Sequence, residues 1–352
     1  MKEKKNTENI PNRIRIVDIA RMANVSVGTV DRVIHKRGRV APEKVKEIKR
    51  ILKELDYQPN ILASSLANKK TYNFVALIPS YDNGEYWEKV VEGVEFAKKE
   101  LKDYNIVIHN IYFDQFDSKT FELASEKLLA FKPEGALIAP HFLKEAFQLT
   151  EKLTLANIPF VLIDSEIRNS KYLAFFGQNS FESGEVGAEI LMSDHYSQKK
   201  ILICHVKKQE LANTNKTEER EKGFRAFFEQ SNLKNKPVII DIDLDVENNE
   251  KNIELLDKLF KSNHDITGAI AFNSKIHSFA YYLEYRNIST IKVLGYDLTS
   301  KNIAYLNKNK IAYLIAQRPD RQGYLALKAM CNYLLFHREP KQDNFIPIDI
   351  IT

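Results

Sequence analysis

The sequence predicts a small all-α domain near the N-terminus and, after it, a larger α/β domain with two lobes and doubly wound parallel sheets. In residues 16–55, apolar side chains recur at helical spacing. From residue 74 onward, short and continuously apolar runs alternate with amphipathic segments, a pattern typical of parallel strands covered by helices on both faces. The alternation extends over about 280 residues, which suits two doubly wound lobes better than one.

Residues 16–38 predict two short helices joined by a tight turn. Each helix carries one apolar stripe: Ile16, Ile19, Ala20 and Ala23 on the first, and Val25, Val30, Val33 and Ile34 on the second. Ser26 stands where the second helix needs an N-cap, and Asn24 suits a left-handed turn residue. The spacing indicates a helix-turn-helix, a motif whose second helix commonly enters the major groove of DNA.

A third helix is predicted after Gly38. Pro42 suits its first position, and its apolar face consists of Val45, Ile48, Ile51, Leu52 and Leu55. We therefore expect a compact three-helix domain over residues 15–58, preceded by a polar arm at 1–14. The loop before the third helix carries candidates for phosphate contacts, namely Lys36, Arg37 and Arg39.

Residues 59–71 predict a short helix and a linker. Pro59 ends the third helix, and Asn60 can cap the next one, which is too short to be stable without a partner. The α/β domain is expected to cover 72–352. Its N-terminal lobe is expected at about 72–178 and 316–338, and its C-terminal lobe at about 179–315 and 339–352.

The strands of the α/β domain are predicted from its apolar runs. These runs lie at 74–79, 106–113, 135–140, 159–164, 173–177, 200–206, 236–242, 268–272, 291–297, 311–317 and 346–352. A single closed barrel would need eight strict strand–helix repeats. The extra strands argue against it, as does the pair of strands without an intervening helix at 159–177.

Charge is distributed unevenly along the chain. Residues 1–70 hold 17 Lys/Arg and 8 Asp/Glu, whereas the remainder holds 35 and 39. A basic head on a slightly acidic body favours nucleic-acid binding by the head. No apolar run is long enough to span a membrane, and no signal-peptide pattern opens the chain. The two cysteines, Cys204 and Cys331, lie in apolar segments, so we expect buried thiols in the cytoplasm.

Polar and aromatic side chains follow many of the predicted strands. Ligands of doubly wound domains bind beyond the carboxyl ends of the strands, where such side chains converge. The residues predicted to meet there are Tyr86, Trp87, Asp114, His141, Asp164, Asn273, Asp297, Gln317 and, on the helix after 200–206, Arg220. Carboxylates, amides, an arginine and aromatic rings suit a polyhydroxylated ligand such as a sugar. Taken singly, each residue could also be a strand-end or helix cap.

Catalytic readings have little support in the sequence. It contains no GxSxG, Walker A, GxGxxG or HExxH motif, and its histidines lack the spacing of metal ligands. Asp114 and Asp164 could form an acid/base pair, but anchoring a ligand is the simpler role. We therefore predict no catalytic residue, no metal and no cofactor.

The chain resembles the LacI/GalR family of bacterial transcription regulators. The resemblance rests on the pattern IxDIAxxAxVSxxTVxRV at 16–33, on LxYxPN at 55–60, and on the short segment xxAxxLA at 61–67. Beyond residue 70 it extends by pattern, since the body resembles two-lobed periplasmic sugar-binding proteins. The resemblance implies a DNA-binding repressor controlled by a small effector, and it implies pairing of hinge helices in a homodimer on a pseudo-palindromic operator.

The resemblance also implies residue roles. In the head, Val27 and Gly28 match the base-reading pair, Arg32 a base contact, and Ser26 and Thr29 phosphate contacts. In the hinge segment, Asn60, Ala63 and Leu66 match the family positions, with Leu66 as the wedge inserted into the minor groove. In the body, effector contacts are implied for Asp164, Arg220, Asn273, Asp297 and Gln317.

Three features depart from the family pattern. Gly28 has no side chain with which to read a base, and Asp31 places an acid on the helix expected to face DNA. The sequence ends without a heptad tail, which favours a dimer over a tetramer. Two other classes stay open at this stage: a solute-binding protein without a DNA role, and a sugar-acting enzyme with an accessory head.

Overall fold

The computed structural model describes residues 15–34, 38–55, 70–193, 199–208, 215–232 and 236–352. The chain divides into two units, Met1–Lys70 and Thr71–Thr352. The predictions for the arm at 1–14, for Lys36 and Arg37, and for the hinge residues Asn60, Ala63 and Leu66 lie outside the described residues.

The first unit contains the three predicted helices, α1 (Ile16–Met22), α2 (Val27–Ile34) and α3 (Pro42–Glu54). Their predicted apolar faces meet in one core, in which Ile19, Val30 and Ile48 are completely buried. Asn24 in the turn has φ +49°, the left-handed conformation expected there. The backbone N–H of Thr29 donates to Ser26 Oγ at 3.2 Å, so Ser26 caps α2 as predicted.

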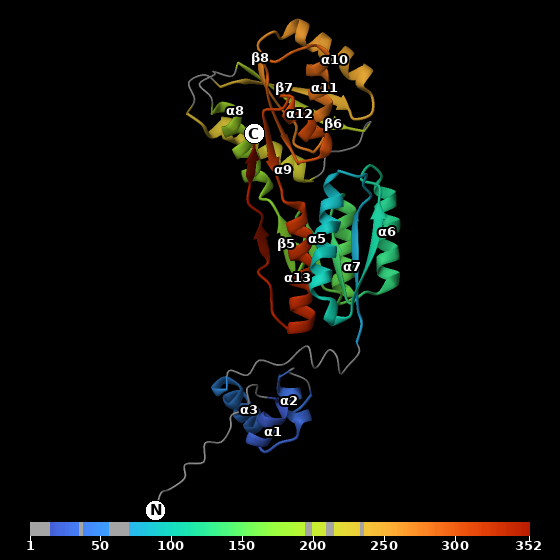
Figure 1. The fold of residues 1–352 in the computed structure, drawn as a ribbon, viewed down its shortest axis with the longest axis vertical. Helices are drawn as coiled ribbons and strands as arrows, with labels where there is room; N and C mark the ends of the chain where they lie inside the picture. The colour runs from blue at the N-terminus through green and yellow to red at the C-terminus, as the bar shows by residue number, and fades with distance from the viewer. Residues whose placement is uncertain (1–14, 35–37, 56–69, 194–198, 209–214, 233–235) are drawn as a thin grey trace, which may run out of the picture. The chain divides into compact units, whose positions relative to one another are not determined.

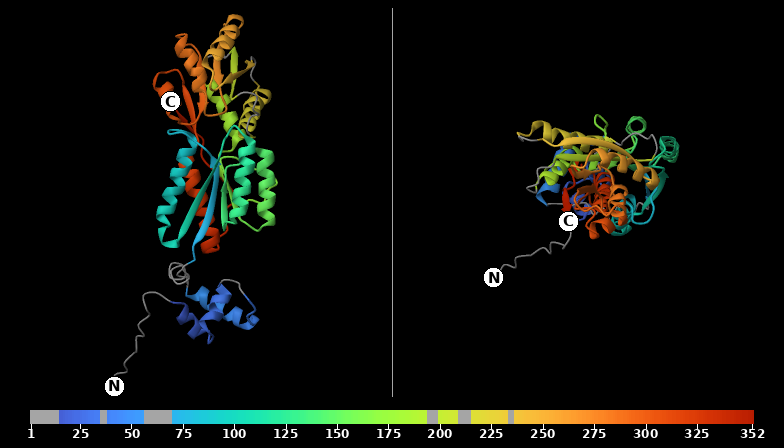
Figure 2. Two further views of the ribbon diagram at one scale, coloured as in Figure 1. Left: turned by 90° about the vertical axis from the view of Figure 1, so that its right-hand side faces the viewer. Right: turned by 90° about the horizontal axis from the view of Figure 1, so that it is seen from above.

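The second unit consists of two lobes, each with helices on both faces of a sheet (Figure 1, Figure 2). The N-terminal lobe contains β1 (Tyr72–Pro79), α5 (Tyr86–Glu100), the 3₁₀ turn η1 (Lys102–Tyr104), β2 (Ile106–Phe113), α6 (Ser118–Phe131), β3 (Gly135–Ile138), α7 (Leu143–Leu155), β4 (Phe160–Ile163), β5 (Ala174–Gly177), α13 (Pro319–Phe336) and β11 (Asp343–Phe345). Its strands lie in the order β11-β5-β4-β3-β1-β2 and are all parallel.

The C-terminal lobe repeats this architecture. It contains α8 (Ser180–Met192), β6 (Lys200–Lys207), α9 (Asn215–Gln230), β7 (Val238–Asp245), α10 (Asn249–Ser262), β8 (Ile266–Ile270), α11 (His277–Tyr285), β9 (Lys292–Tyr296), α12 (Ser300–Asn307), β10 (Tyr313–Ala316) and β12 (Asp349–Ile351). The sheet order is β12-β10-β9-β8-β6-β7, and β12 alone among these strands runs antiparallel to its neighbour. The prediction of two doubly wound lobes is confirmed.

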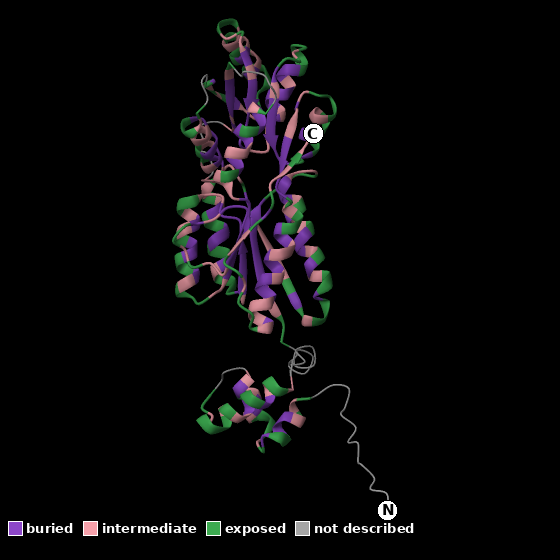
Figure 3. Cartoon of the chain, turned by 90° about the vertical axis from the view of Figure 1, so that its left-hand side faces the viewer, coloured by how far each residue is buried: buried purple, intermediate pink, exposed green. Residues whose placement is uncertain are grey.

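Alternation along the strands explains how each sheet is covered on both faces. In β1, Phe74 and Ala76 face the core formed with α5 and α13, whereas Val75 and Leu77 face the core formed with α6 and α7. The inner strands are accordingly buried inside each lobe, whereas the edge strands β2, β7, β11 and β12 are only partly buried. Many exposed residues lie on the outer faces of the helices (Figure 3). Such two-sided burial is the reason that the strands read as continuous apolar runs.

The last segment of the chain differs from the prediction. Residues 339–352 were expected to belong to the C-terminal lobe, with one strand at 346–352. Instead, β11 (Asp343–Phe345) pairs with β5 in the N-terminal lobe, and only β12 joins the other sheet. The residues before Phe345 are polar because β11 is an edge strand, so no apolar run marks it.

Candidate ligand cleft and nucleic-acid-binding surface

One side of α2 packs in the core of the first unit and the other side is exposed. Val30 and Val33 are buried, whereas Ser26, Val27, Gly28 and Arg32 are exposed. The predicted base-reading residues therefore share an exposed surface, as α-helical spacing requires. Thr29 is half-buried and its Oγ1 lies 2.9 Å from Ser26 Oγ, so these two hydroxyls already hydrogen-bond each other.

Arg32 folds back along its own helix. Its Nε donates a hydrogen bond of 3.0 Å to the carbonyl oxygen of Gly28, one turn earlier. A bidentate contact to guanine uses two guanidinium N–H groups. The two Nη groups of Arg32 can make such a contact while Nε keeps its hydrogen bond to Gly28. That bond would then orient the guanidinium group.

A cavity of about 460 Å³ lies between the two lobes of the second unit and is lined from both. Helix α5, the turn after β3 and the end of β4 contribute from the N-terminal lobe; α9 and the residues after β8 and β9 contribute from the other. Six of the predicted ligand-binding residues line it: Tyr86, Trp87, His141, Asp164, Asn273 and Asp297.

Asp164 and Asp297 occupy equivalent places in the two lobes. Each follows a central strand, β4 or β9, and has a left-handed backbone with φ +74° and +73° respectively. Each backbone N–H donates to a neighbouring strand, from Asp164 to the carbonyl of Phe176 and from Asp297 to that of Ile315, both at 2.9 Å. The repeated strand-end geometry places a carboxylate in the cleft from each lobe.

Arg220 and Gln317 lie behind the wall of the cavity. Arg220 is completely buried; its Nη1 donates to the carbonyl of Phe272 at 2.8 Å, and its guanidinium lies 3.9 Å from the centre of the Tyr296 ring. Its Nε and Nη2 have no hydrogen-bond partner among the described residues. The side-chain amide of Gln317 donates to Asp297 Oδ1. Gln317 therefore orients a carboxylate that lines the cavity, without lining the cavity itself.

Asp114 does not line the cavity. It is exposed, and its Oδ1 accepts a 2.9 Å hydrogen bond from the backbone N–H of Phe116. It therefore caps the turn after β2, the ordinary role of a carboxylate at a strand end. The next two residues, Gln115 and Phe116, line the cavity in its place.

Lys216 lines the cleft and was not predicted. Its Nζ lies 2.6 and 2.8 Å from the two carboxylate oxygens of Asp164 and 5.1 Å from the centre of the Tyr86 ring. Since Lys216 is on α9 and Asp164 follows β4, this ion pair crosses the cleft. Lys216 precedes Arg220 by one helical turn, and that spacing is the signal that could have identified it.

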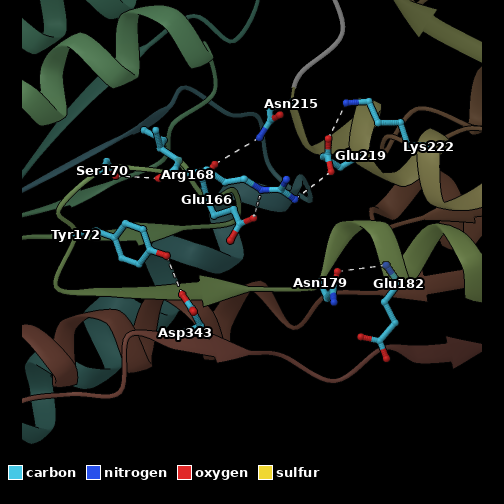
Figure 4. A network of polar contacts seen from close by, with 11 residues as sticks. Glu166, Arg168, Ser170, Tyr172, Asn179, Glu182, Asn215, Glu219, Lys222 and Asp343 are labelled. Carbon is cyan, nitrogen blue, oxygen red and sulfur yellow. Dashed lines mark hydrogen bonds and ion pairs between the residues drawn. The ribbon is translucent and has the colours of Figure 1, made fainter.

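Other contacts also join the lobes around the cleft. Lys275 after β8 pairs with Glu85 before α5 at 2.8 Å. On another side, Arg168 lies between Glu166 of its own lobe and Glu219 of α9, at 3.3 Å from each (Figure 4). In the same view, Asn215 at the start of α9 donates to the carbonyl of Glu166 at 3.4 Å.

Burial and charge shift several pKa values in the cleft. Burial raises the pKa of Asp297, although the nearby Lys216 and Arg220 oppose the shift. Burial raises the pKa of Tyr86 well above its usual value, helped by the carboxylates of Asp164 and Asp297. Burial, together with the charge of Lys216, lowers the pKa of His141 to about 4, so His141 is neutral at pH 7.

A possible metal-binding cluster lies apart from this cleft. His205, Glu221 and Asp241 bring ligand atoms within 4.8 Å of one another. However, Arg225 forms ion pairs with both carboxylates, so the group is held as a salt-bridge network. The two carboxylates of the cluster are thus already paired with a cation.

The fold and the cleft define a class of protein: a two-lobed ligand-binding body of the periplasmic-binding-protein type, joined to a helix-turn-helix head. The family described as "Periplasmic binding protein domain" matches residues 74–338, and "Bacterial regulatory proteins, lacI family" matches residues 15–60. The chain belongs to the LacI family of bacterial regulatory proteins.

Individual relatives agree with this assignment. A solved structure of a putative LacI transcriptional regulator from Bacteroides fragilis is 32% identical, with a TM-score of 0.75, over 80% of this chain and 97% of that one. The ribose operon repressor of Lactococcus lactis is 26% identical over 80% of each chain. The regulator NtdR of Bacillus subtilis is 29% identical over 54% of each chain, so the match spans about half of that relative.

A likeness to GanP, a glucose-galactose binding protein from Geobacillus stearothermophilus, shows the fold alone, at 22% identity and a TM-score of 0.70 over 80% of this chain and 97% of that one. The ribose operon repressor and the putative LacI regulator, each matched over 80% of this chain, are transcription regulators, in agreement with the prediction of a regulator. Among the described residues, no helix is long and apolar enough to cross a membrane.

Proposed function

We propose that this chain is a cytoplasmic, homodimeric transcription repressor whose binding to a pseudo-palindromic operator is controlled by a sugar or sugar derivative. The observation that carries the proposal is the cleft itself. Two carboxylates, Asp164 and Asp297, enter it from opposite lobes, and Asn273 and the ring of Trp87 line it with them. Carboxylates and amides bind vicinal hydroxyls, and an indole covers an apolar sugar face.

Arg220 supports a ligand rich in hydrogen-bond acceptors. Two of its buried N–H-bearing nitrogens have no partner among the described residues, and leaving such donors unsatisfied is costly. Arg220 lies directly behind the cavity wall, where a hydroxyl oxygen or a water bound with the ligand could satisfy them. The size of the cavity, about 460 Å³, accommodates one monosaccharide with its bound water.

The head would bind DNA through α2, with Val27, Gly28 and Arg32 toward the bases and Ser26 and Thr29 toward phosphates. A ligand that binds one relative position of the lobes more tightly than another shifts the equilibrium between them by that difference in affinity. In a dimer, this movement would change the spacing of the two heads. Asn60, Ala63 and Leu66 are proposed to bind the central base pairs of the operator.

Two measurements on the full-length protein test the proposal. Selection from random double-stranded DNA should enrich a sequence with dyad symmetry, and sedimentation should give a dimer. A thermal-shift screen of D-ribose, D-arabinose, D-glucose, glucose 6-phosphate and adenosine should find a stabilising ligand, since binding at 100 times Kd adds about 2.7 kcal/mol. A ligand that stabilises the protein without any selected DNA would instead support a solute-binding protein.

A further inference from the structure

Among the described residues, three segments cross between the lobes, and the side chain of Gln178 joins them. The crossings lie between β5 and α8, between β10 and α13, and between β11 and β12. Gln178 is in the first of these and is 2% exposed. Its Nε2 donates one hydrogen bond to the carbonyl of Ala316, the last residue of β10 before the second crossing, and another to that of Pro347 in the third, both at 2.9 Å.

The geometry uses the full donor capacity of this amide. A glutamine amide nitrogen carries two hydrogens. Here one binds the backbone at the end of β10, where the second crossing begins, and the other binds the backbone of the third crossing. Because the amide is buried, water cannot easily replace either bond when the segments separate. This side chain therefore links all three crossings. The backbone N–H of Ile346, which donates to the carbonyl of Gly177 at 2.8 Å, and the ion pair of Arg318 with Asp349 each join two of the same segments.

A line of amides connects the crossings to the cleft. Gln322 on α13 is completely buried, and its Nε2 donates to the carbonyl of Gln317 at 2.8 Å. The side chain of Gln317 in turn donates to Asp297, which lines the cavity. Gln317 follows Ala316 directly, so the backbone that Gln178 holds is adjacent to the residue that orients the Asp297 carboxylate.

We infer that Gln178 is a positioning residue: it clasps the three interlobe crossings and thereby fixes the relative position of the lobes on which closure of the cleft depends. Only one consequence of the inference rests on the proposed function: that loss of Gln178 would change ligand-controlled DNA binding. The position of the lobes can be measured without ligand or DNA, so a failure of the clasp and a failure of the proposed function are distinguishable.

The experiment compares Gln178→Met with Asn344→Leu in the full-length protein. Gln178→Met keeps the length of the side chain and removes both donors. Asn344 is the matched control, since its Nδ2 also donates to two carbonyls, Phe175 and Lys341, but both belong to the N-terminal lobe. Gln178→Asn is a second variant, which retains the amide but is one methylene too short to keep both bonds.

Spin labels at Lys127→Cys and Glu250→Cys, exposed on α6 and α10, report the distance between the lobes. The native Cys204 and Cys331 are 2% and 1% exposed and should not be labelled. We expect the Gln178 variants to broaden the distance distribution at least twofold, or to shift its mean, while Asn344→Leu leaves it unchanged. If Gln178→Met fails to fold, Gln178→Asn decides. Distributions equal to wild type in the folded Gln178 variants would overturn the inference.

Discussion

The ammonium group of Lys216 lies 2.6 and 2.8 Å from the two carboxylate oxygens of Asp164, so one ion pair joins helix α9 of the C-terminal lobe to the end of β4 in the other lobe. The two side chains are 13% and 6% exposed. Taking two charges out of water costs desolvation free energy, but removing one partner of such a pair is strongly destabilising because the other charge stays buried without compensation. The pair also occupies part of the cleft that a ligand would enter.

Replacing Lys216 should therefore destabilise the protein through Asp164. We expect Lys216→Met to lower the free energy of unfolding by roughly 1–3 kcal/mol, because the carboxylate loses its partner. Asp164→Asn in the same chain should recover part of this loss; asparagine tolerates the left-handed backbone at position 164. Urea denaturation of the two single variants and the double variant measures the coupling free energy between Lys216 and Asp164. If the two changes in unfolding free energy simply add, the ion pair does not contribute to stability.

Arg220 should matter for ligand affinity far more than its neighbour Arg225. Any sugar that stabilises the wild type should bind Arg220→Lys at least tenfold more weakly, about 1.4 kcal/mol, since a lysine cannot supply the two unpartnered guanidinium nitrogens. Arg225→Lys is the control, because Arg225 is on the same helix but pairs with Glu221 and Asp241 outside the cavity. Calorimetric titration compares them; equal affinities would place the ligand elsewhere.

Arg32 should contribute to sequence-specific DNA binding. Arg32→Ala is expected to cost roughly 1–3 kcal/mol on the selected operator and to relax the preference at one base pair. Arg50→Ala serves as the control, since Arg50 on α3 is exposed and is paired with Glu47 and Glu54 of its own helix. Fluorescence anisotropy on operator and random DNA separates the effects. A loss on random DNA as large as on the operator would contradict a base contact.

His141 should make the stability of the protein depend on pH. Its pKa in the folded state is lowered to about 4 from 6.5, so the unfolded chain binds the proton more readily. The contribution of a neutral His141 to the free energy of unfolding is therefore fully present above about pH 6.5 and is lost as the pH decreases toward 4. We expect His141→Gln to lose less stability than the wild type between pH 7 and pH 4.5. Parallel loss in both proteins, measured by urea denaturation, would exclude this contribution.

The close packing of helix α8 against helix α9 should not tolerate an added methyl group. A Cβ on Gly223 would lie 1.9 Å from the carbonyl oxygen of Phe181, whereas a Cβ on Gly187 would meet only side chains, the nearest at 3.3 Å. We expect Gly223→Ala to destabilise by about 1–3 kcal/mol despite its better helix propensity, and Gly187→Ala to change stability by less than about 1 kcal/mol. Thermal denaturation of both variants, which carry the same chemical change, provides the comparison.

The elements were predictable wherever a residue's role was local. The three-helix core, the left-handed Asn24 and the Ser26 cap follow from spacing within a few residues, and the strands follow from runs buried on both faces. Six ligand-cleft residues were predicted because parallel strands end on one edge of a sheet. The prediction that Asp114 lines the cleft was wrong, because a carboxylate at a strand end can instead cap the turn that follows it.

The sequence by itself determined the architecture and the kind of side chain at each strand end, because the periodicities of helices and strands can be recognised within short stretches of the chain. Only the tertiary structure decided which of those side chains meet. It placed β11 in the N-terminal lobe, Lys216 on Asp164, and Gln178 across three crossings. Each of these contacts joins segments far apart in the chain. Their geometry depends on how two lobes pack, and no local pattern encodes that packing.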